Sequence, residues 1–266
     1  MAKVIKNPLS TYGYNLIALP KEGIAPLLLL YKNNKGVSSL ENSLIDFFAI
    51  SDSPPPSISK ENKIIDIKGD SSVSFEAEGG INVLDWLLQK LRMGKLAGNL
   101  KIESAHQVQI SYENVTEDKV SLLDLDNFIS GSEPQKNKFN TFKEKLENSE
   151  LFVVNSILKS DSFSVSAADQ NGHSVDIEGN IKGVVDANVE VSKQTNHTIL
   201  LKYEKADPIV FAFKAQRIIY DKKKWWEFFK KDEAKFRIKD QQGVVLKNES
   251  DFPTEPFIAG NELIDL

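Results

Sequence analysis

The 266-residue chain contains no cysteine, and that absence removes several kinds of chemistry. Disulfides, thiolate metal sites, thiol nucleophiles and S-acyl groups all need a cysteine side chain. Long apolar runs are absent as well. The longest, residues 24–31, is far shorter than the roughly 20 residues of a membrane-spanning helix. Residues 1–6 lack the apolar stretch of a signal peptide, so we expect an intracellular protein.

Motifs for catalysis are equally scarce. None of the three histidines, His106, His173 and His197, lies within metal-ligand spacing of another. The sequence has no nucleophile elbow, phosphate-binding glycine loop, dinucleotide fingerprint or zinc-protease motif. Asp124 and Asp126 are two positions apart, which puts them on different faces of a predicted helix, as is typical of solvated acids. We expect no enzyme, metal or cofactor, and keep an unrecognised hydrolase as a minor alternative.

Charge is distributed unevenly along the chain. Residues 248–266 carry five acidic and no basic side chains, which accounts for the whole net charge of −5. Residues 221–239 are basic and aromatic, with eight basic side chains against four acidic ones. The acidic tail is also rich in large apolar side chains, which solvated acidic tails usually lack. This favours a detachable cover docked on a basic body; the alternative is an ordinary C-terminal segment packed on its own domain.

Alternation of apolar and polar residues predicts an α+β fold, a twisted antiparallel sheet with interspersed helices. We expect strands over 14–19, 24–31, 63–68, 73–78, 99–112, 151–158, 162–168, 174–178, 184–191, 198–203 and 209–219. We expect helices over 40–48, 81–93, 116–130 and 136–148. A turn at 20–23 should join the first two strands, and Asn171-Gly172 should form a hairpin turn. Gly79-Gly80 should end a strand before the helix over 81–93, whose leucines repeat every 3.6 residues.

Two pairs of segments match transmembrane strands of about 9–11 residues: 63–78 with 99–112, and 151–168 with 174–191. Their apolar faces comprise Ile65, Ile67, Val73, Phe75, Leu100, Ile102, Val108, Ile110, Phe163, Val165, Val175 and Ile177. Alternation describes half-buried strands of a soluble sheet equally well. The glycine-bracketed helix over 81–93 favours membrane insertion, because extending it would join the first pair into one long hairpin. A closed assembly of such hairpins would satisfy every backbone hydrogen bond inside a bilayer.

Four stretches resemble those of bacterial gasdermins: 13–27 (GYNLIALPKEGIAPL), 108–120 (VQISYENVTEDKV), 150–160 (ELFVVNSILKS) and 208–220 (PIVFAFKAQRIIY). The similarity runs in order from about residue 12 to residue 220. It implies an autoinhibited pore former of prokaryotic, anti-phage defence. A companion protease, often caspase-like, would remove a C-terminal peptide from a cytoplasmic protein. The freed body would then oligomerise and insert β-hairpins into the inner membrane, killing the cell.

The resemblance divides the chain into a pore-forming body, 1–240, and a cleavable linker with an autoinhibitory peptide, 241–266. The autoinhibitory contacts would be Phe252, Phe257, Ile258, Leu263, Ile264 and Leu266. Candidate cleavage positions are Asp240, Leu246, Lys247 and Asp251. Headgroup contacts would be Lys222, Lys223, Lys224, Lys230 and Lys231.

One departure concerns membrane targeting. Gasdermins of this kind carry an acylated cysteine close to the N-terminus, whereas Lys3 and its neighbours offer none. Targeting would therefore rest on other features, such as the lysines above. The expected partners are an activating protease, membrane lipids and further copies of the chain, and no nucleic acid. The main alternative is a soluble β-rich domain that binds a lipid or another apolar ligand.

Overall fold

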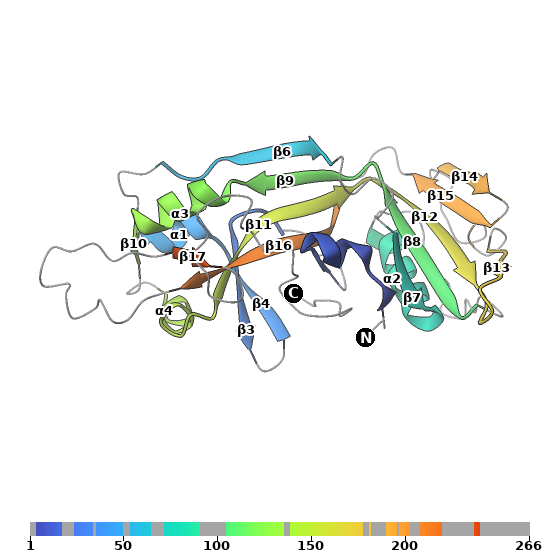
Figure 1. Ribbon diagram of the computed structural model, residues 1–266, viewed down its shortest axis with the longest axis horizontal. Helices are drawn as coiled ribbons and strands as arrows, with labels where there is room; N and C mark the ends of the chain where they lie inside the picture. The colour runs from blue at the N-terminus through green and yellow to red at the C-terminus, as the bar shows by residue number, and fades with distance from the viewer. Residues whose placement is uncertain are drawn as a thin grey trace, which may run out of the picture.

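The computed structural model describes residues 4–17, 24–33, 36–49, 54–64, 72–90, 105–135, 139–177, 181, 190–195, 197–202, 208–219 and 237–239. Over this part the chain is α+β, and all its strand pairings are antiparallel. The predicted fold class is therefore confirmed. Figure 1 shows an elongated molecule in which two sheets follow one another along the long axis.

The first sheet contains seven strands among the described residues. Their order is β1 (Val4–Lys6), β7 (Ser72–Glu76), β8 (Gln107–Glu113), β12 (Ser162–Ala168), β15 (Thr198–Lys202) and β14 (Glu190–Thr195), with β13 (Ser174–Val175) paired to β12. Helix α2 (Ala77–Lys90) packs on one face of this sheet (Figure 1).

The second sheet contains eight described strands. Its main order is β17 (Arg237–Lys239), β16 (Ile209–Ile219), β11 (Leu151–Ser160), β3 (Leu28–Asn33) and β4 (Gly36–Ser43). Of the others, β2 (Asn15–Leu16) pairs with β16, β9 (Thr116–Val120) with β11, and β6 (Ile58–Lys63) with β9. A 3-10 helix, η1 (Pro8–Tyr12), lies between β1 and β2.

Three helices pack on one face of the second sheet: α1 (Leu44–Phe47), α3 (Leu122–Ser130) and α4 (Asn140–Glu147). β5 (Phe48–Ala49) and β10 (Glu133–Pro134) pair with each other beside them. Phe48 and Phe142 form part of the aromatic core beneath these helices. The opposite face has an apolar core of its own, which includes Leu30, Phe152 and Phe213.

One bent two-stranded ribbon connects the sheets (Figure 1). β8 runs into β9 through Asn114, and β11 runs into β12 through Asp161, so two paired strands pass from one sheet to the other. At the bend Asn114 has a left-handed φ of 49°, a conformation that asparagine tolerates better than most residues. Its Nδ2 donates to Asp161 Oδ1 and Ser162 Oγ, each at 3.2 Å, which fixes the bend.

Several predicted elements were correct, and others were wrong at their boundaries. The bounds of β12 and β16 and the hairpin turn at Gly172 (φ 81°) are confirmed. The helix predicted over 116–130 is wrong in its first part, because residues 116–120 form β9 between β6 and β11. The helix starts only after Ser121, whose hydroxyl accepts a hydrogen bond from the Asp124 N–H.

Two more expectations need correction. Most of 40–48 is not helical, because β4 extends to Ser43 through its pairing with β3. The strand expected over 24–31 starts only at Leu28, as β3, which pairs with β4 and β11. The turn expected at 20–23 lies outside the described residues.

Gly79-Gly80 does not separate a strand from a helix. Helix α2 starts at Ala77 and includes both glycines. A β-carbon on Gly80 would lie 2.5 Å from the Val108 Cβ, closer than such atoms approach one another. Gly80 therefore permits the first turn of α2 to lie directly on β8, and tertiary packing outweighs the low helix propensity of the two glycines.

Candidate membrane-inserting sheet

The register of the first sheet sorts the rows of side chains that cross it into apolar rows and mainly polar rows. One apolar row contains Val73, Ile110, Val165 and Ile199. The next contains Phe75, Val108, Ala167 and Val175. All of these side chains are buried except Val175, which is half-buried. Since side chains alternate between faces along a strand, these rows form one continuous apolar face.

Helix α2 covers this apolar face with the residues that its periodicity predicted. Val83, Leu84, Leu87 and Leu88 are buried and belong to the same core as the two apolar rows. Phe163 and Ile177 lie in this core as well. The apolar face of the sheet is thus buried beneath α2, and Ile181 contributes to the same core.

The intervening rows form a hydroxyl and amide face. One row contains Ser72, Ser111 and Ser164 and, on β15, the half-buried Leu200; the next contains Ser74, Gln109, Ser166 and Thr198. The hydroxyls of Ser72 and Ser111 are 2.6 Å apart, and the Ser164 hydroxyl donates to Glu113 Oε1 at 3.0 Å. These contacts run between neighbouring strands, so the polar face also holds the sheet together.

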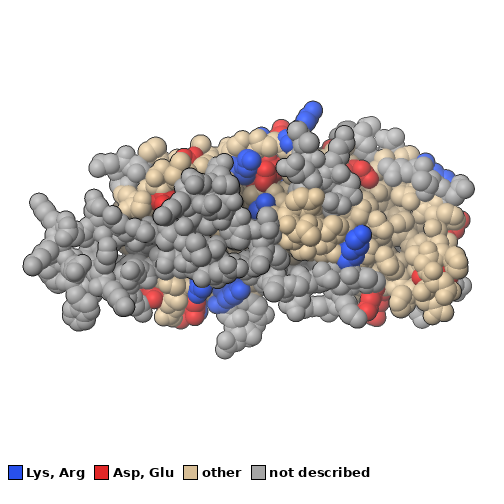
Figure 2. Space-filling view, in the orientation of Figure 1, with Lys and Arg blue, Asp and Glu red and all other residues tan. Residues whose placement is uncertain are grey.

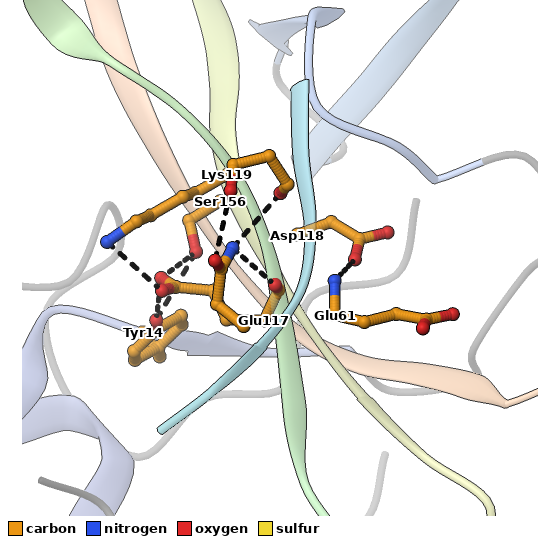
Figure 3. Close-up of polar contacts among 8 residues, drawn as sticks. Tyr14, Glu61, Glu117, Asp118, Lys119 and Ser156 are labelled. Carbon is orange, nitrogen blue, oxygen red and sulfur yellow. Dashed lines mark hydrogen bonds and ion pairs between the residues drawn. The ribbon is translucent and has the colours of Figure 1, made fainter. Parts of the chain in front are cut away.

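A buried polar cluster ties the chain before β2 to the second sheet (Figure 3). The Tyr14 hydroxyl donates to Glu117 Oε1 at 2.6 Å, and the Ser156 hydroxyl donates to the same oxygen at 2.5 Å. Lys119 Nζ is 3.7 Å from the other carboxylate oxygen. Tyr14 and Ser156 are both only 2% exposed, so the two hydroxyl groups satisfy a carboxylate that little water reaches.

The environment of this cluster changes the proton affinity of two members. Burial, and then the negative charge of Glu117, raise the pKa of the Tyr14 phenol far above its ordinary value. Burial lowers the pKa of Lys214, whose Nζ is 4.2 Å from the Tyr14 ring centroid; Glu117 opposes this effect and Lys119 adds to it. The neutral phenol is therefore the form that the fold stabilises.

Beside the cluster, Asp118 fixes an irregularity in β6 (Figure 3). Its Oδ1 accepts a hydrogen bond from the Glu61 N–H at 2.8 Å, and its Oδ2 is 2.7 Å from Lys159 Nζ. Glu61 has a left-handed φ of 55°, and the register of β6 with β9 shifts between Ser59 and Asn62. The hydrogen bond from Asp118 therefore holds the bulged strand β6, while the ion pair with Lys159 ties Asp118 to β11.

An aromatic stack joins the two sheets elsewhere. The rings of Tyr112 on β8 and Phe211 on β16 are nearly parallel, at 8°, with centroids 3.8 Å apart. Burial raises the pKa of the Tyr112 phenol. The first sheet is thus attached to the second by the ribbon and by this stack.

The sequence profile of the Bacterial Gasdermin Family matches residues 17–226. The chain belongs to this family. A gasdermin bGSDM from Gillisia limnaea is 61% identical over 266 residues, 100% of both chains. A gasdermin bGSDM from an unknown prokaryotic organism is 30% identical over 268 residues, again 100% of both. A solved bacterial gasdermin from Bradyrhizobium tropiciagri aligns with a TM-score of 0.46 at 14% identity, covering 81% of this chain and 86% of that one.

The structure of this gasdermin brings together every predicted hairpin residue that it describes. These are Val73, Phe75, Val108, Ile110, Phe163, Val165, Val175 and Ile177, all in or against the core under α2. The predicted pairing of residues 63–78 with 99–112 is confirmed where β7 meets β8. Residues 151–168 are not one straight strand, because β11 and β12 belong to different sheets.

The other predicted site residues lie outside the described residues. They are Ile65, Ile67, Leu100 and Ile102 of the hairpins, the five headgroup lysines from Lys222 to Lys231, the four cleavage candidates and the six autoinhibitory side chains from Phe252 to Leu266. In Figure 2 the described charged side chains are scattered over the face in view.

Two further findings concern only the described part of this gasdermin. No helix there has both the length and the apolar character needed to cross a membrane. None of its histidine and carboxylate side chains form a group of three or more that could hold a metal ion.

Sequence reasoning missed four residues that shape the site: Tyr14, Glu117, Asn114 and Gly80. Tyr14 and Glu117 are 103 positions apart, so no local pattern signals their contact. Asn114 interrupts a long alternating segment and is a residue type that tolerates left-handed backbone, which is a weak signal of a bend. A glycine at position 80 indicates that the backbone there has a special role. It does not show whether a strand or helix ends at this point or whether the helix packs unusually close to a strand.

Proposed function

We propose that this gasdermin is an autoinhibited pore-forming effector of anti-phage defence. Removal of the C-terminal peptide by a protease, of the caspase-like kind, lets the body oligomerise and insert β-hairpins into the inner membrane, which kills the cell. The intact protein is cytoplasmic and is not an enzyme. Its partners are the protease, membrane lipids and further copies of the chain, not nucleic acid.

The two-faced first sheet is the observation that supports this proposal best. Its apolar rows cross four strands without interruption and are covered by α2, while the alternate rows carry mainly hydroxyl and amide groups. Strands of this kind can face lipid on one side and water on the other once their edges are paired. Displacing α2 would expose the apolar face that a bilayer can then cover.

The cut is proposed within 240–251, at Asp240, Leu246, Lys247 or Asp251. Within it residues 241–243 (QQG) and 247–250 (KNES) are polar and include a glycine, as exposed cleavable loops often do. Dye release from vesicles of phosphatidylethanolamine and phosphatidylglycerol tests the proposal, with a site for a sequence-specific protease inserted after Gly243. A pore former leaks dye only after cleavage. Failure of the cleaved protein to release dye or bind vesicles would contradict the proposal and favour a ligand-binding domain.

A further inference from the structure

We propose that a bulge in β6 closes the outer edge of the second sheet, so that β6 of a second copy of this chain cannot pair with it. The bulge consists of Lys60 and Glu61, which lie opposite the single residue Asp118 of β9. The inference goes beyond the proposed function, because it concerns the intact chain and an edge of the second sheet. It involves neither cleavage nor a membrane.

β6 is an outermost strand of the second sheet. Among the described residues it pairs with β9 and with no other strand, and Figure 1 shows it along the rim of the molecule. Four of its six residues are exposed: Ser59, Lys60, Glu61 and Lys63. An exposed outer strand presents backbone N–H and C=O groups that can pair with a strand of another chain. In a solution of this protein β6 of a second copy is such a strand, since two identical strands can pair antiparallel about a two-fold axis.

The ladder between β6 and β9 has one residue too many on the side of β6. Ser59 pairs with Lys119 and Asn62 pairs with Glu117, so two residues of β6 face one residue of β9. A bulge of this kind bends its strand and increases the local twist. The outer edge of β6 therefore departs from the regular course that a further strand needs for continuous pairing.

The backbone at the bulge is strained and is held by neighbouring side chains. Glu61 has a left-handed φ of 55°, a conformation that is unfavourable for residues with a β-carbon and is usually left to glycine. Its N–H donates to Asp118 Oδ1 at 2.8 Å (Figure 3), and Asp118 Oδ2 is 2.7 Å from Lys159 Nζ on β11. Asp118 is only 7% exposed, so this anchor is buried. Strain that surrounding contacts maintain in this way often serves a function.

The side chain of Asn62 holds the bulge from its other end. Asn62 Nδ2 donates to the Ser59 carbonyl oxygen at 3.2 Å and to the Glu117 carbonyl oxygen at 3.1 Å. Asn62 Oδ1 accepts a hydrogen bond from the Ser59 hydroxyl at 3.0 Å. Because this amide spans the bulge and also reaches β9, it fixes the extra residue in place. Side chains of β6, β9 and β11 thus maintain an irregularity that the backbone alone disfavours.

Deletion of Glu61 tests the proposal in the intact, uncleaved chain. It leaves Lys60 alone opposite Asp118, so the ladder becomes regular from Ile58 to Lys63. Circular dichroism verifies the fold, and sedimentation velocity measures association. We expect the deletion variant to dimerise at least about tenfold more strongly than the parent, because a regular exposed edge accepts a second strand. Equal association of the two proteins would overturn the proposal, whatever the outcome of dye release.

Two substitutions at the same position separate the shape of the edge from its charge, and they decide the question if the deletion variant does not fold. Glu61→Gly and Glu61→Thr both remove the carboxylate. Glycine adopts left-handed backbone freely, whereas the β-branched threonine strongly disfavours it. We expect Glu61→Gly to associate no more than the parent and Glu61→Thr to dimerise more strongly. Equal association of the two variants would show that the bulge is not the cause of protection.

A thiol cross-link identifies the strand through which the copies join. Ser59→Cys is combined with deletion of Glu61, in a chain that has no other cysteine, and treated with a short bifunctional thiol reagent. Asn171→Cys in the same deletion variant is the matched control, because Asn171 is exposed in the turn beyond β12 of the first sheet. We expect cross-linked dimers from Ser59→Cys and not from Asn171→Cys. Cross-linking through Asn171→Cys alone would place the contact away from β6 and contradict the proposal.

Discussion

Gly80 lies against Val108 so closely that any β-carbon at position 80 would be only 2.5 Å from the Val108 Cβ. The contact joins the first turn of α2 to the start of β8, in the sheet that we propose enters the membrane. Its closeness makes the position of the helix sensitive to a single methyl group.

Gly80→Ala should therefore destabilise the intact protein, although alanine is the better helix former. The gain in helix propensity is about 1 kcal/mol, while overpacking against a core strand costs about 1–3 kcal/mol. We expect a net loss of about 1 kcal/mol in the free energy of unfolding, measured by urea denaturation. Val108→Ala should not rescue it, because the closest atom, Val108 Cβ, remains. A stabilised Gly80→Ala protein would show that helix and strand separate easily.

The hydrogen bond from the Tyr14 hydroxyl to Glu117 should contribute less to the free energy of unfolding at alkaline pH than at neutral pH. Tyr14→Phe leaves Glu117 with one hydroxyl donor fewer and should cost about 1–3 kcal/mol of unfolding free energy near pH 7. The folded-state pKa of Tyr14 is raised, so its contribution is present below the unfolded pKa of about 10 and declines as pH rises above it. The cost of Tyr14→Phe should consequently shrink between pH 9 and 11.

Urea denaturation of parent and variant at each pH isolates this effect, because Lys214 and Tyr112 titrate in both proteins. The lowered pKa of Lys214 acts in the opposite direction, since the folded state then holds fewer protons than the unfolded one. A difference between parent and Tyr14→Phe that stays constant across this pH range would rule out the protonation of Tyr14 as its cause.

Val175 offers a test of the lipid-facing rows that the core positions cannot provide. An arginine at Ile110 would bury a charge in the resting protein, since Ile110 is 0% exposed, so that variant should fail to fold. Val175 is on the same face but half-buried, and its neighbour Ser174 is exposed on the other face. Val175→Arg should fold and lose dye release after cleavage, while Ser174→Arg should retain it.

The energetic reason is the cost of a cation on the lipid face, about 2–4 kcal/mol near the bilayer midplane and less towards the interfaces. Circular dichroism should first confirm that both variants fold. Equal leakage from the two cleaved proteins would mean that the strand carrying Val175 does not contact lipid.

The bend of the ribbon should depend on Asn114. Asn114→Ala loses the hydrogen bonds to Asp161 and Ser162 and forces alanine into a left-handed conformation, which costs about 1–2 kcal/mol. Asn114→Gly loses the same bonds without that backbone cost and is the matched control. Thermal denaturation should rank the parent above the glycine variant and the glycine variant above the alanine variant. Equal stability of the two variants would indicate that the backbone at the bend relaxes.

The C-terminal tail gives the last prediction. Replacing Phe257 and Ile258 with Asp removes two apolar side chains, each worth roughly 1.5–3 kcal/mol if buried on docking. We expect the doubly substituted chain to be toxic in cells without any protease. Phe257→Leu with Ile258→Val should remain silent, because both positions stay apolar. A silent aspartate variant would show that these side chains do not hold the body inactive.

The sequence by itself determined those elements and buried faces that follow from a short periodic pattern of apolar residues. Period-two alternation placed β12 and β16 and separated the apolar from the polar side chains of the first sheet. The 3.6-residue repeat identified the buried face of α2, and Asn171-Gly172 the hairpin turn. Each signal lies within a few consecutive residues, because side-chain direction along a strand or helix is set by local backbone geometry.

Only the tertiary structure decided which segments became neighbours. Residues 116–120 became β9 because β6 and β11 pair with them on both sides, although their sequence fits a helix. Helix α2 continues through Gly79-Gly80 because β8 lies against it. Tyr14 forms a hydrogen bond with Glu117, although the two residues are 103 positions apart in the sequence. These outcomes depend on contacts between distant segments, whose energies exceed the local preferences of the residues involved.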